Sequence, residues 1–376
     1  MSYKIPLFDL NFNFEEARAV VDVINSKWIS AGPRVLEFEE RFAELLNVKY
    51  AIAVSNCTVS LHLAMSLCSI EPGDEIICPS LTFVATCNAI RYAGAVPVFA
   101  DIKSLEDLTI DPDEIERKIT SKTRAIMVMH YGGFACDMDR IMSIAYKHNL
   151  KVIEDACHGP MSVYKERRLG TIGNVGCFSF FSNKNISTGE GGMIITNDDD
   201  LNYRARLLRS HGMTSLSFER SKGHSTSYDV IELGYNYRMD DIHAAIGLVQ
   251  LSKLHPDIIR RSEIRAEYLH LLGGLDKIYI PFRGYGEFSS NYIFTVILKD
   301  SDADRRDLIR DRMANSGIQT SIHYPAVHRF KIYRDYRANL PKTEYVSDNL
   351  ITLPMYGSLT STQVKYIAEE LRNALA

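Results

Sequence analysis

The chain has 376 residues, which at about 150 residues per domain predicts two domains, or one large domain with a smaller one attached. Hydrophobic residues make up 46% of the sequence and charged residues 24%, so the composition is that of a globular protein and excludes a mainly disordered or fibrous one. The 43 Lys and Arg against 47 Asp and Glu leave a formal net charge of -4, which provides no basic excess for a nucleic-acid partner.

The amino terminus and the cysteines indicate the compartment. No apolar run approaches the roughly 18 residues that span a bilayer, and the short run from Ile5 to Phe8 is followed by Asp9 and Asn11. The seven cysteines all lie in the first half of the chain and never form a C-x-x-C pair. This pattern favours reduced thiols over disulfides or a zinc site. We therefore expect a cytoplasmic protein with no membrane partner and no bound metal.

The first predicted element is an amphipathic helix over residues 33–46, because Val35, Phe38 and Phe42 recur at helical spacing after Pro33. Short β-rich runs then alternate with helical patterns, and these runs are residues 50–54, 75–79, 96–102, 124–130, 151–156, 175–181 and 192–196. Such alternation is typical of an α/β fold, in which helices cover both faces of a mostly parallel sheet. The runs are apolar throughout, as expected for strands buried on both faces.

The texture of the sequence changes after a helix predicted over residues 240–254. A charged helical stretch at 257–272, strands at 278–280, 292–298 and 320–323, and helices at 305–316 and 362–375 follow. We therefore place a boundary near residue 255. Residues 1–254 form the predicted large α/β domain and residues 255–376 a smaller C-terminal α+β domain, on which the N-terminal segment can pack.

Polar residues at the ends of the strands are the first candidates for a site, because ligands of open α/β sheets bind beyond the carboxyl ends of the strands. Ser55, Asn56, Cys57 and Thr58 stand between a predicted strand and a predicted helix. Free amides and hydroxyls at a helix start suit a phosphate. Taken alone, the motif favours a helix N-cap over a phosphate site.

A second candidate is the carboxylate pair Glu154 and Asp155, which ends the apolar strand at 151–156. Adjacent side chains of a strand point to opposite sides, so one of the two is expected at the ligand edge. A buried carboxylate needs a partner. That partner is either a protonated ring nitrogen of a cofactor or an internal salt bridge, and the sequence leaves both open.

The third candidate is Lys184, which follows an aromatic strand and precedes a glycine-rich segment through which a bulky ring can approach the backbone. A lysine in a partly apolar site can act as a Schiff-base nucleophile, although an isolated lysine is more often a surface residue of a loop. A phosphate cradle, a terminal carboxylate and a sheltered lysine together match the needs of pyridoxal phosphate.

These motifs carry a family resemblance that extends nearly from end to end. The matching segments are residues 28–33, 55–64, 79–86, 154–156, 177–192, 234–239, 323–325 and 353–355. In their order and spacing the sequence resembles the DegT/DnrJ/EryC1/StrS family of sugar aminotransferases, which are fold-type I pyridoxal-phosphate enzymes and usually homodimers. The resemblance implies that fold, that cofactor and a homodimer with shared active sites.

The resemblance also implies roles for single residues. Lys184 is the catalytic lysine that holds the cofactor, and Asp155 faces its pyridine nitrogen. His158 lies near the phenolic oxygen of the cofactor. Phe83 stacks on the ring, although an aromatic residue there can equally pack in the core.

Further matched positions concern the cofactor phosphate. Thr58 and Ser179 match phosphate-binding hydroxyls, and Cys57, which stands where many members have glycine, can still donate its backbone amide. Asn236 matches a residue that reaches the phosphate from the neighbouring subunit, although it can also cap the following helix.

The retained Lys184 favours transamination, since certain family members with His at this position are dehydratases. We expect a ping-pong reaction with two halves. In the first, glutamate passes its amino group to the cofactor, which yields pyridoxamine phosphate and a keto acid. In the second, the amino group passes to a keto sugar. In both halves Lys184 moves the proton. Its pKa should be lowered by burial and by the cofactor, because a general base must be neutral.

The acceptor is the least determined part of the prediction. Candidate substrate contacts are Glu190, Arg220, His323 and Tyr324, and the charged runs at 215–229 and 328–342 can contact a nucleotide diphosphate or be solvated faces. The leading acceptor is a nucleotide-linked 3-keto or 4-keto 6-deoxysugar. The alternatives are a sugar dehydratase, a cyclitol aminotransferase and a non-catalytic protein that binds the cofactor. A nicotinamide enzyme is disfavoured because no G-x-G-x-x-G follows the first strands.

Overall fold

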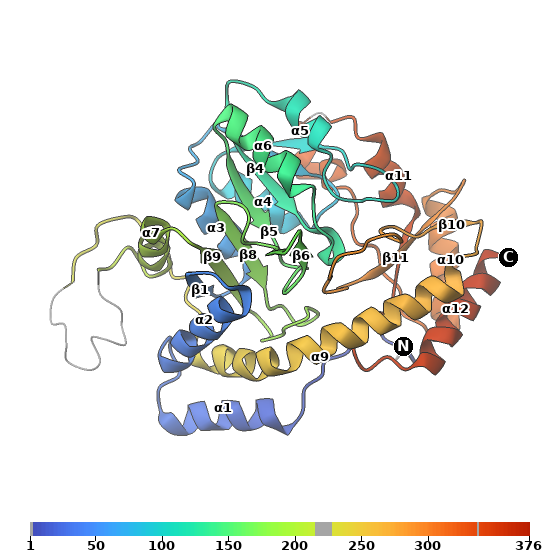
Figure 1. The fold of residues 1–376 in the computed structure, drawn as a ribbon, viewed down its shortest axis with the longest axis horizontal. Helices are drawn as coiled ribbons and strands as arrows, with labels where there is room; N and C mark the ends of the chain where they lie inside the picture. Colours follow the sequence, from blue (N-terminus) through green and yellow to red (C-terminus); the bar gives the residue numbers. More distant parts are fainter. Residues whose placement is uncertain (1–2, 215–227, 337) are drawn as a thin grey trace.

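A seven-stranded sheet forms the centre of the computed structural model, which describes residues 3–214, 228–336 and 338–376 (Figure 1). The strand order is β1-β9-β8-β5-β4-β2-β3. The strands are β1 (Tyr50–Val54), β2 (Glu75–Pro79), β3 (Val96–Ala100), β4 (Thr123–Met129), β5 (Lys151–Asp155), β8 (Val175–Ser179) and β9 (Gly192–Thr196). Only β9 runs against its neighbours in this sheet, pairing antiparallel with β1 and β8. The predicted α/β fold with a mostly parallel sheet is confirmed.

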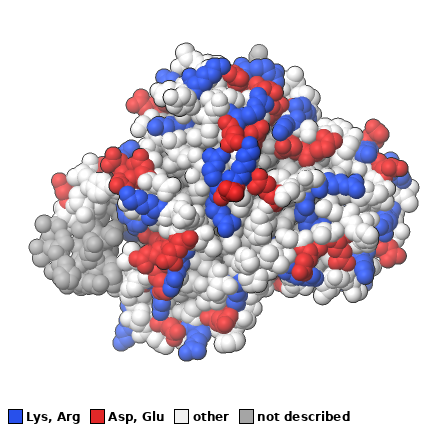
Figure 2. Space-filling model, in the orientation of Figure 1, with Lys and Arg blue, Asp and Glu red and all other residues white. Residues whose placement is uncertain are grey.

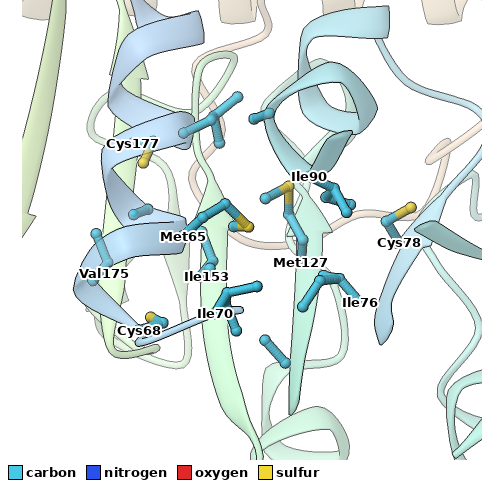
Figure 3. Close-up of a cluster of buried hydrophobic side chains, with 14 of the residues drawn as sticks. Met65, Cys68, Ile70, Ile76, Cys78, Ile90, Met127, Ile153, Val175 and Cys177 are labelled. Atoms are coloured by element: carbon cyan, nitrogen blue, oxygen red, sulfur yellow. The ribbon is translucent and has the colours of Figure 1, made fainter. Parts of the chain in front are cut away.

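Helices cover both faces of this sheet. On one face lie α3 (Cys57–Leu67), α4 (Val84–Tyr92) and α7 (Asp199–Arg209), and on the other lie α2 (Pro33–Leu46), α5 (Pro112–Lys118), α6 (Met138–His148) and α9 (Asp241–Leu272). Successive strand residues therefore enter opposite cores. Ile76, Met127 and Ile153 pack under α3 and α4 (Figure 3), whereas Ile77 and Val128 pack under α5 and α6. Burial on both faces explains the unbroken apolar runs.

A smaller antiparallel sheet follows in the C-terminal part. It consists of β10 (Ile278–Tyr279), β11 (Phe294–Leu298) and β12 (Leu350–Leu353), and the helices of this part are α10 (Ala303–Asn315), α11 (Pro341–Asn349) and α12 (Ser361–Leu375). Ile5 packs into the same core as residues of α9, α10 and α12, and forms a β-bridge with Ile318. The beginning of the chain therefore lies on the C-terminal unit.

The long helix α9 joins the two parts (Figure 1). The sequence predicts separate helices at 240–254 and 257–272, but the structure has one helix of 32 residues that contains Pro256. A proline removes one hydrogen bond from a helix interior. Burial of Leu254 and Ile258 on either side of Pro256 offsets this cost. The proposed domain boundary near residue 255 falls inside this helix.

Smaller elements complete the described chain. They are α1 (Phe14–Ser26), the hairpin β6 (Val163–Tyr164) and β7 (Arg167–Arg168), and the 3-10 turns η1 (Tyr131–Gly133), η2 (Val327–Arg329) and η3 (Lys331–Tyr333). The prediction of a strand at 320–323 is wrong. Among these residues only Ser321 forms a β-bridge, and its partner is Thr352 of β12. In the described ranges, no helix combines the length and apolarity needed to cross a membrane. Basic and acidic side chains are interspersed on the face shown in Figure 2.

Candidate active site

A cavity of about 620 Å³ opens where β1, β5 and β8 end and α3 and α4 begin. Its size is in the range of about 300–1,000 Å³ that is usual for small-molecule sites. The described residues that line it are Asn56, Cys57, Thr58, Val59, Leu61, Phe83, Ala85, Tyr92, Asp155, Cys157, Ser179, Phe181, Asn183, Lys184, Glu190, Tyr292, His323 and Tyr324. Nine of the predicted site residues are therefore brought together, from segments far apart in the sequence.

Lys184 lies on the loop that connects β8 to β9. The backbone N–H of Lys184 donates to the carbonyl of Phe181 at 2.9 Å, and the N–H of Thr188 donates to the carbonyl of Phe180 at 2.8 Å. The loop closes where Ser179 pairs with Gly192. A Cβ atom on Gly192 would lie 2.5 Å from the carbonyl carbon of Asn56. This glycine therefore admits the backbone of the α3 loop, whereas Gly189 in the same segment has open space beside it.

The ε-amine of Lys184 is surrounded by polarisable and acidic groups. Its Nζ lies 3.8 Å from Cys157 Sγ and 4.4 Å from the centre of the Tyr292 ring. Burial acts to lower the pKa of Lys184, but Cys157, Tyr292 and Asp155 outweigh it and raise the pKa above its ordinary value. Burial by itself therefore does not lower the pKa of Lys184, and the lowering expected from the cofactor stays a prediction.

Glu154 and Asp155 divide the two roles that the sequence left open. Glu154 is fully buried and accepts hydrogen bonds from the N–H groups of Gly170, Ile172 and Gly173 and from the ring of His130. It belongs to the internal structure. Asp155 lines the cavity instead and is the carboxylate at the ligand edge.

Asp155 is held in place by two donors. Its Oδ2 accepts from the hydroxyl of Thr86 at 2.8 Å, and its Oδ1 accepts from the backbone N–H of Cys157 at 3.2 Å. Both bonds turn the carboxylate toward the cavity and leave it able to accept one more donor, such as a ring N–H.

The start of α3 provides backbone donors. Asn56 is the N-cap, and its side chain accepts from the N–H of Val59 at 3.1 Å, so the N-cap prediction is confirmed. Within the described part of the chain, the N–H groups of Cys57 and Thr58 donate to no protein acceptor. Cys57, Thr58 and Ser179 all line the cavity, so unused N–H groups and two hydroxyls belong to its wall.

His158 lies behind the cavity wall. It is buried, its Nδ1 accepts from the N–H of Gly132 at 3.2 Å, and its Nε2 lies 2.9 Å from the hydroxyl of Tyr324. Its ring stacks on Tyr292 at 4.2 Å between ring centres. Burial, followed by Lys184 and His323, lowers the pKa of His158 well below its ordinary value, so the ring is neutral at pH 7. The structure thus places His158 next to Tyr292 and Tyr324, which themselves line the cavity.

The other predicted residues lie in three kinds of place. Phe83, Glu190 and His323 line the cavity, and Phe83 is 54% exposed at its mouth. Asn236 is exposed, bridges to Ser210 and does not belong to the described lining of this cavity. Arg220 and most of the charged run at 215–229 lie outside the described residues.

Nine of the described lining residues lie outside the predicted set, and three of these adjoin Lys184. Cys157 and Tyr292 contact its amine, and Asn183 precedes it in the chain. Tyr292 stands at the start of an apolar run that looks like ordinary core. Position gives the one available signal, since Asn183 and Cys157 each lie within two residues of a predicted site residue.

The residues present fit pyridoxal phosphate. Unused N–H groups and two hydroxyls suit the phosphate, the Asp155 carboxylate suits a protonated ring nitrogen, and Lys184 supplies an amine. Asn183 Oδ1 is buried in the cavity wall without a hydrogen-bond partner among the described residues. A bound group with an N–H or O–H donor would satisfy it.

Comparisons with known proteins agree with this fit. The model of the DegT/DnrJ/EryC1/StrS aminotransferase family matches residues 12–372. The chain is 38% identical to GDP-perosamine synthase of Escherichia coli O157:H7 over 98% of its length and 97% of that protein. Its fold is similar to the putative sugar aminotransferase Spr1654 from Streptococcus pneumoniae in the PMP form, with a TM-score of 0.93, 27% identity and 99% of each chain covered. It is also similar to Helicobacter pylori PseC, an aminotransferase involved in the biosynthesis of pseudoaminic acid, with a TM-score of 0.92, 29% identity and 100% and 99% coverage.

Proposed function

Because the chain belongs to the DegT/DnrJ/EryC1/StrS family and is a pyridoxal-phosphate-dependent sugar aminotransferase, we propose that it moves an amino group from L-glutamate to a nucleotide-linked 3-keto or 4-keto 6-deoxysugar. The observation that carries the proposal is the shared cavity of Lys184, Asp155 and the start of α3. The name GDP-perosamine synthase, which denotes a nucleotide-linked sugar, supports this choice of acceptor.

Several residues of the cavity have a proposed role toward the cofactor. Lys184 would bind it covalently, the Asp155 carboxylate would accept a hydrogen bond from its ring nitrogen, and the first N–H groups of α3 with Thr58 and Ser179 would hold its phosphate. Phe83, which is half exposed, would cover the ring.

The proposed mechanism uses Lys184 as the group that moves a proton. Bound pyridoxal phosphate supplies the electron-withdrawing ring that makes the substrate C–H acidic. When its Nζ is free, Lys184 would take the proton from the substrate carbon and return it within the same cavity. Asp155 would keep the ring nitrogen of the cofactor protonated. His323 and Tyr324, which line the cavity, are the proposed contacts for the sugar.

We also propose a homodimer in which each cavity is completed by Asn236 of the second copy. The exposed position of Asn236, away from its own cavity, supports this. Co-expression of Lys184→Ala and Asn236→Ala chains tests it, because a mixed dimer then contains one fully intact site. Roughly a quarter of the wild-type activity is expected, since half of the dimers are mixed. No recovery over the separate variants would show that Asn236 acts within its own chain.

The proposed compartment is the cytoplasm, where the seven free cysteines would stay reduced. For the substrate, a cyclitol ketone is the competing proposal. Retention of Lys184 agrees with transamination and not with the dehydratase or the non-catalytic protein considered from the sequence.

An absorbance experiment tests the proposed donor and step. The purified protein is mixed with pyridoxal phosphate and then with excess L-glutamate, beside Lys184→Ala as the matched variant. We expect the visible band of the bound cofactor to give way to the pyridoxamine form in the wild type only. If glutamate changes nothing in a cofactor-loaded wild type, another amino donor becomes the better proposal. Keto sugars are then tested as acceptors by product analysis.

A further inference from the structure

Tyr292 and Lys184 form a contact that the proposed mechanism does not use. Lys184 Nζ lies over the Tyr292 ring, 4.4 Å from its centre. This is the geometry of a cation–π interaction, for which the cation lies within about 6 Å of the ring centre. Tyr292 is only 4% exposed, and desolvation strengthens such a contact.

The ring of Tyr292 is held by His158. The two rings stack with centres 4.2 Å apart and an angle of 28° between their planes. His158 is itself fixed at both nitrogens, because Nδ1 accepts from Gly132 N–H and the neutral ring then carries its proton on Nε2, which donates to the Tyr324 hydroxyl. The His158 ring therefore cannot turn without breaking a buried hydrogen bond, and it holds the Tyr292 ring by stacking against it.

The backbone of Tyr292 is fixed as well. Its N–H donates to the carbonyl of Gly132 at 3.1 Å, and its carbonyl accepts from Arg261 Nη1 of α9 at 3.4 Å. Gly132 therefore holds both Tyr292 and His158. The aromatic face below Lys184 is therefore held by the turn η1 and by α9 together.

The other titratable groups around the amine are of two kinds. Cys157, Asp155, Cys57 and Tyr292 favour the charged amine, whereas His158 and His323 face it as neutral rings because burial, and then Lys184 itself, lowers their pKa values. Burial raises the pKa of Tyr292 and outweighs the opposing effect of Lys184, so its phenol is neutral and its electron-rich face is available to the amine.

We propose that Tyr292 is a positioning residue that seats the Lys184 amine on its ring whenever this amine is not bonded to the cofactor, with His158 fixing the ring. The inference rests on the proposed function for its catalytic meaning, since in that function Lys184 is released in each half-reaction. This contact would keep the released amine inside the cavity, where it can act on the bound substrate, and would prevent it from extending into solvent.

The test is a fluorination series at residue 292 in the full-length protein freed of cofactor. Phenylalanine, 3,5-difluorophenylalanine and 3,4,5-trifluorophenylalanine have nearly the same shape, but each fluorine weakens the negative ring face. The readout is reductive methylation of Lys184 by formaldehyde and a hydride donor, followed by mass spectrometry across pH. Lys147, exposed on α6, serves as the control lysine in the same sample.

We expect Lys184 of the Tyr292→Phe variant to be methylated at the wild-type rate within about twofold, because the aromatic ring remains. From Phe to the trifluoro residue the pH midpoint should fall stepwise, which corresponds to roughly threefold to tenfold faster methylation at pH 8. The rate at Lys147 should stay constant. A flat series in proteins with wild-type unfolding temperatures overturns the proposal.

The glutamate half-reaction, followed by absorbance across pH in the same cofactor-loaded proteins, separates this inference from the proposed function. A shifted methylation midpoint without any glutamate reaction would refute the proposed function but would still support the positioning of Lys184 by Tyr292. A working glutamate reaction with an unshifted pH profile and a flat methylation series would refute this positioning alone. A purely structural Tyr292 would change stability without moving either pH profile.

Discussion

Replacement of Glu154 by glutamine should destabilise the protein strongly although it removes no volume. The carboxylate accepts four N–H groups, two on each oxygen: Ile172 and Gly173 on Oε1, and Gly170 and His130 on Oε2. Glutamine has one acceptor oxygen, so its NH₂ group must face two of these donors. Leaving two buried donors unsatisfied costs about 1–3 kcal/mol each, or about 2–6 kcal/mol in total.

Chemical denaturation of Glu154→Gln beside Asp155→Asn measures this cost with a matched control. Asparagine at 155 keeps an acceptor for the N–H of Cys157, and its NH₂ can donate to the hydroxyl of Thr86. We therefore expect little loss of stability in Asp155→Asn but a large loss of cofactor function. A Glu154→Gln protein that unfolds within 1 kcal/mol of the wild type would refute the donor count on which this reasoning rests.

Three further expectations concern packing, pH and reactivity. Gly192→Ala should weaken cofactor binding, measured by absorbance titration, because its Cβ would strike the backbone of the α3 loop, whereas Gly286→Ala, which has open space, should bind normally. Burial acts to raise the pKa of Glu39, but Arg209 and Arg206 outweigh it and lower this pKa below the ordinary 4.5. The stability advantage of the wild type over Glu39→Gln in denaturant should therefore be full above pH 4.5 and shrink as pH falls through the lowered pKa. Burial, then Asp155, raises the pKa of Cys57 well above its ordinary value, so iodoacetamide at pH 8 should label Cys57 at least about tenfold more slowly than free cysteine; equal rates, seen by mass spectrometry, would contradict this.

The sequence predicts the central sheet well because each strand is a short apolar run between breakers. All seven predicted runs of this sheet contain strands, and the helix at 33–46 agrees with α2 at both ends. The sequence predicts less well those elements whose ends depend on packing against the rest of the fold. Pro256 indicates a helix end, but packing on both sides overrides it, and β12 escapes because Leu350–Leu353 continues directly from α11 without a turn signal.

For the site, the sequence identifies residues that share a motif but not those that share only space. Asp155 ends a strand, Thr58 lies in the first turn of a helix and Lys184 lies on the loop after a strand, so the rule of strand ends finds them. Tyr292 comes from the segment before β11 and reaches Lys184 only through the fold. No sequence motif or residue spacing therefore predicts the contact between Tyr292 and Lys184.

The single reversed strand β9 has a consequence for how the chemistry of such a site can vary. Because β9 starts at the edge where β8 ends, the chain leaves and re-enters the sheet at the paired positions Ser179 and Gly192. The lysine is thus carried on a closed hairpin whose two stems are anchored in the buried sheet. Exchanges at the tip, such as at Asn183, alter what surrounds the amine without disturbing its supports. The architecture separates the part of the loop that can diversify from the part that must stay constant.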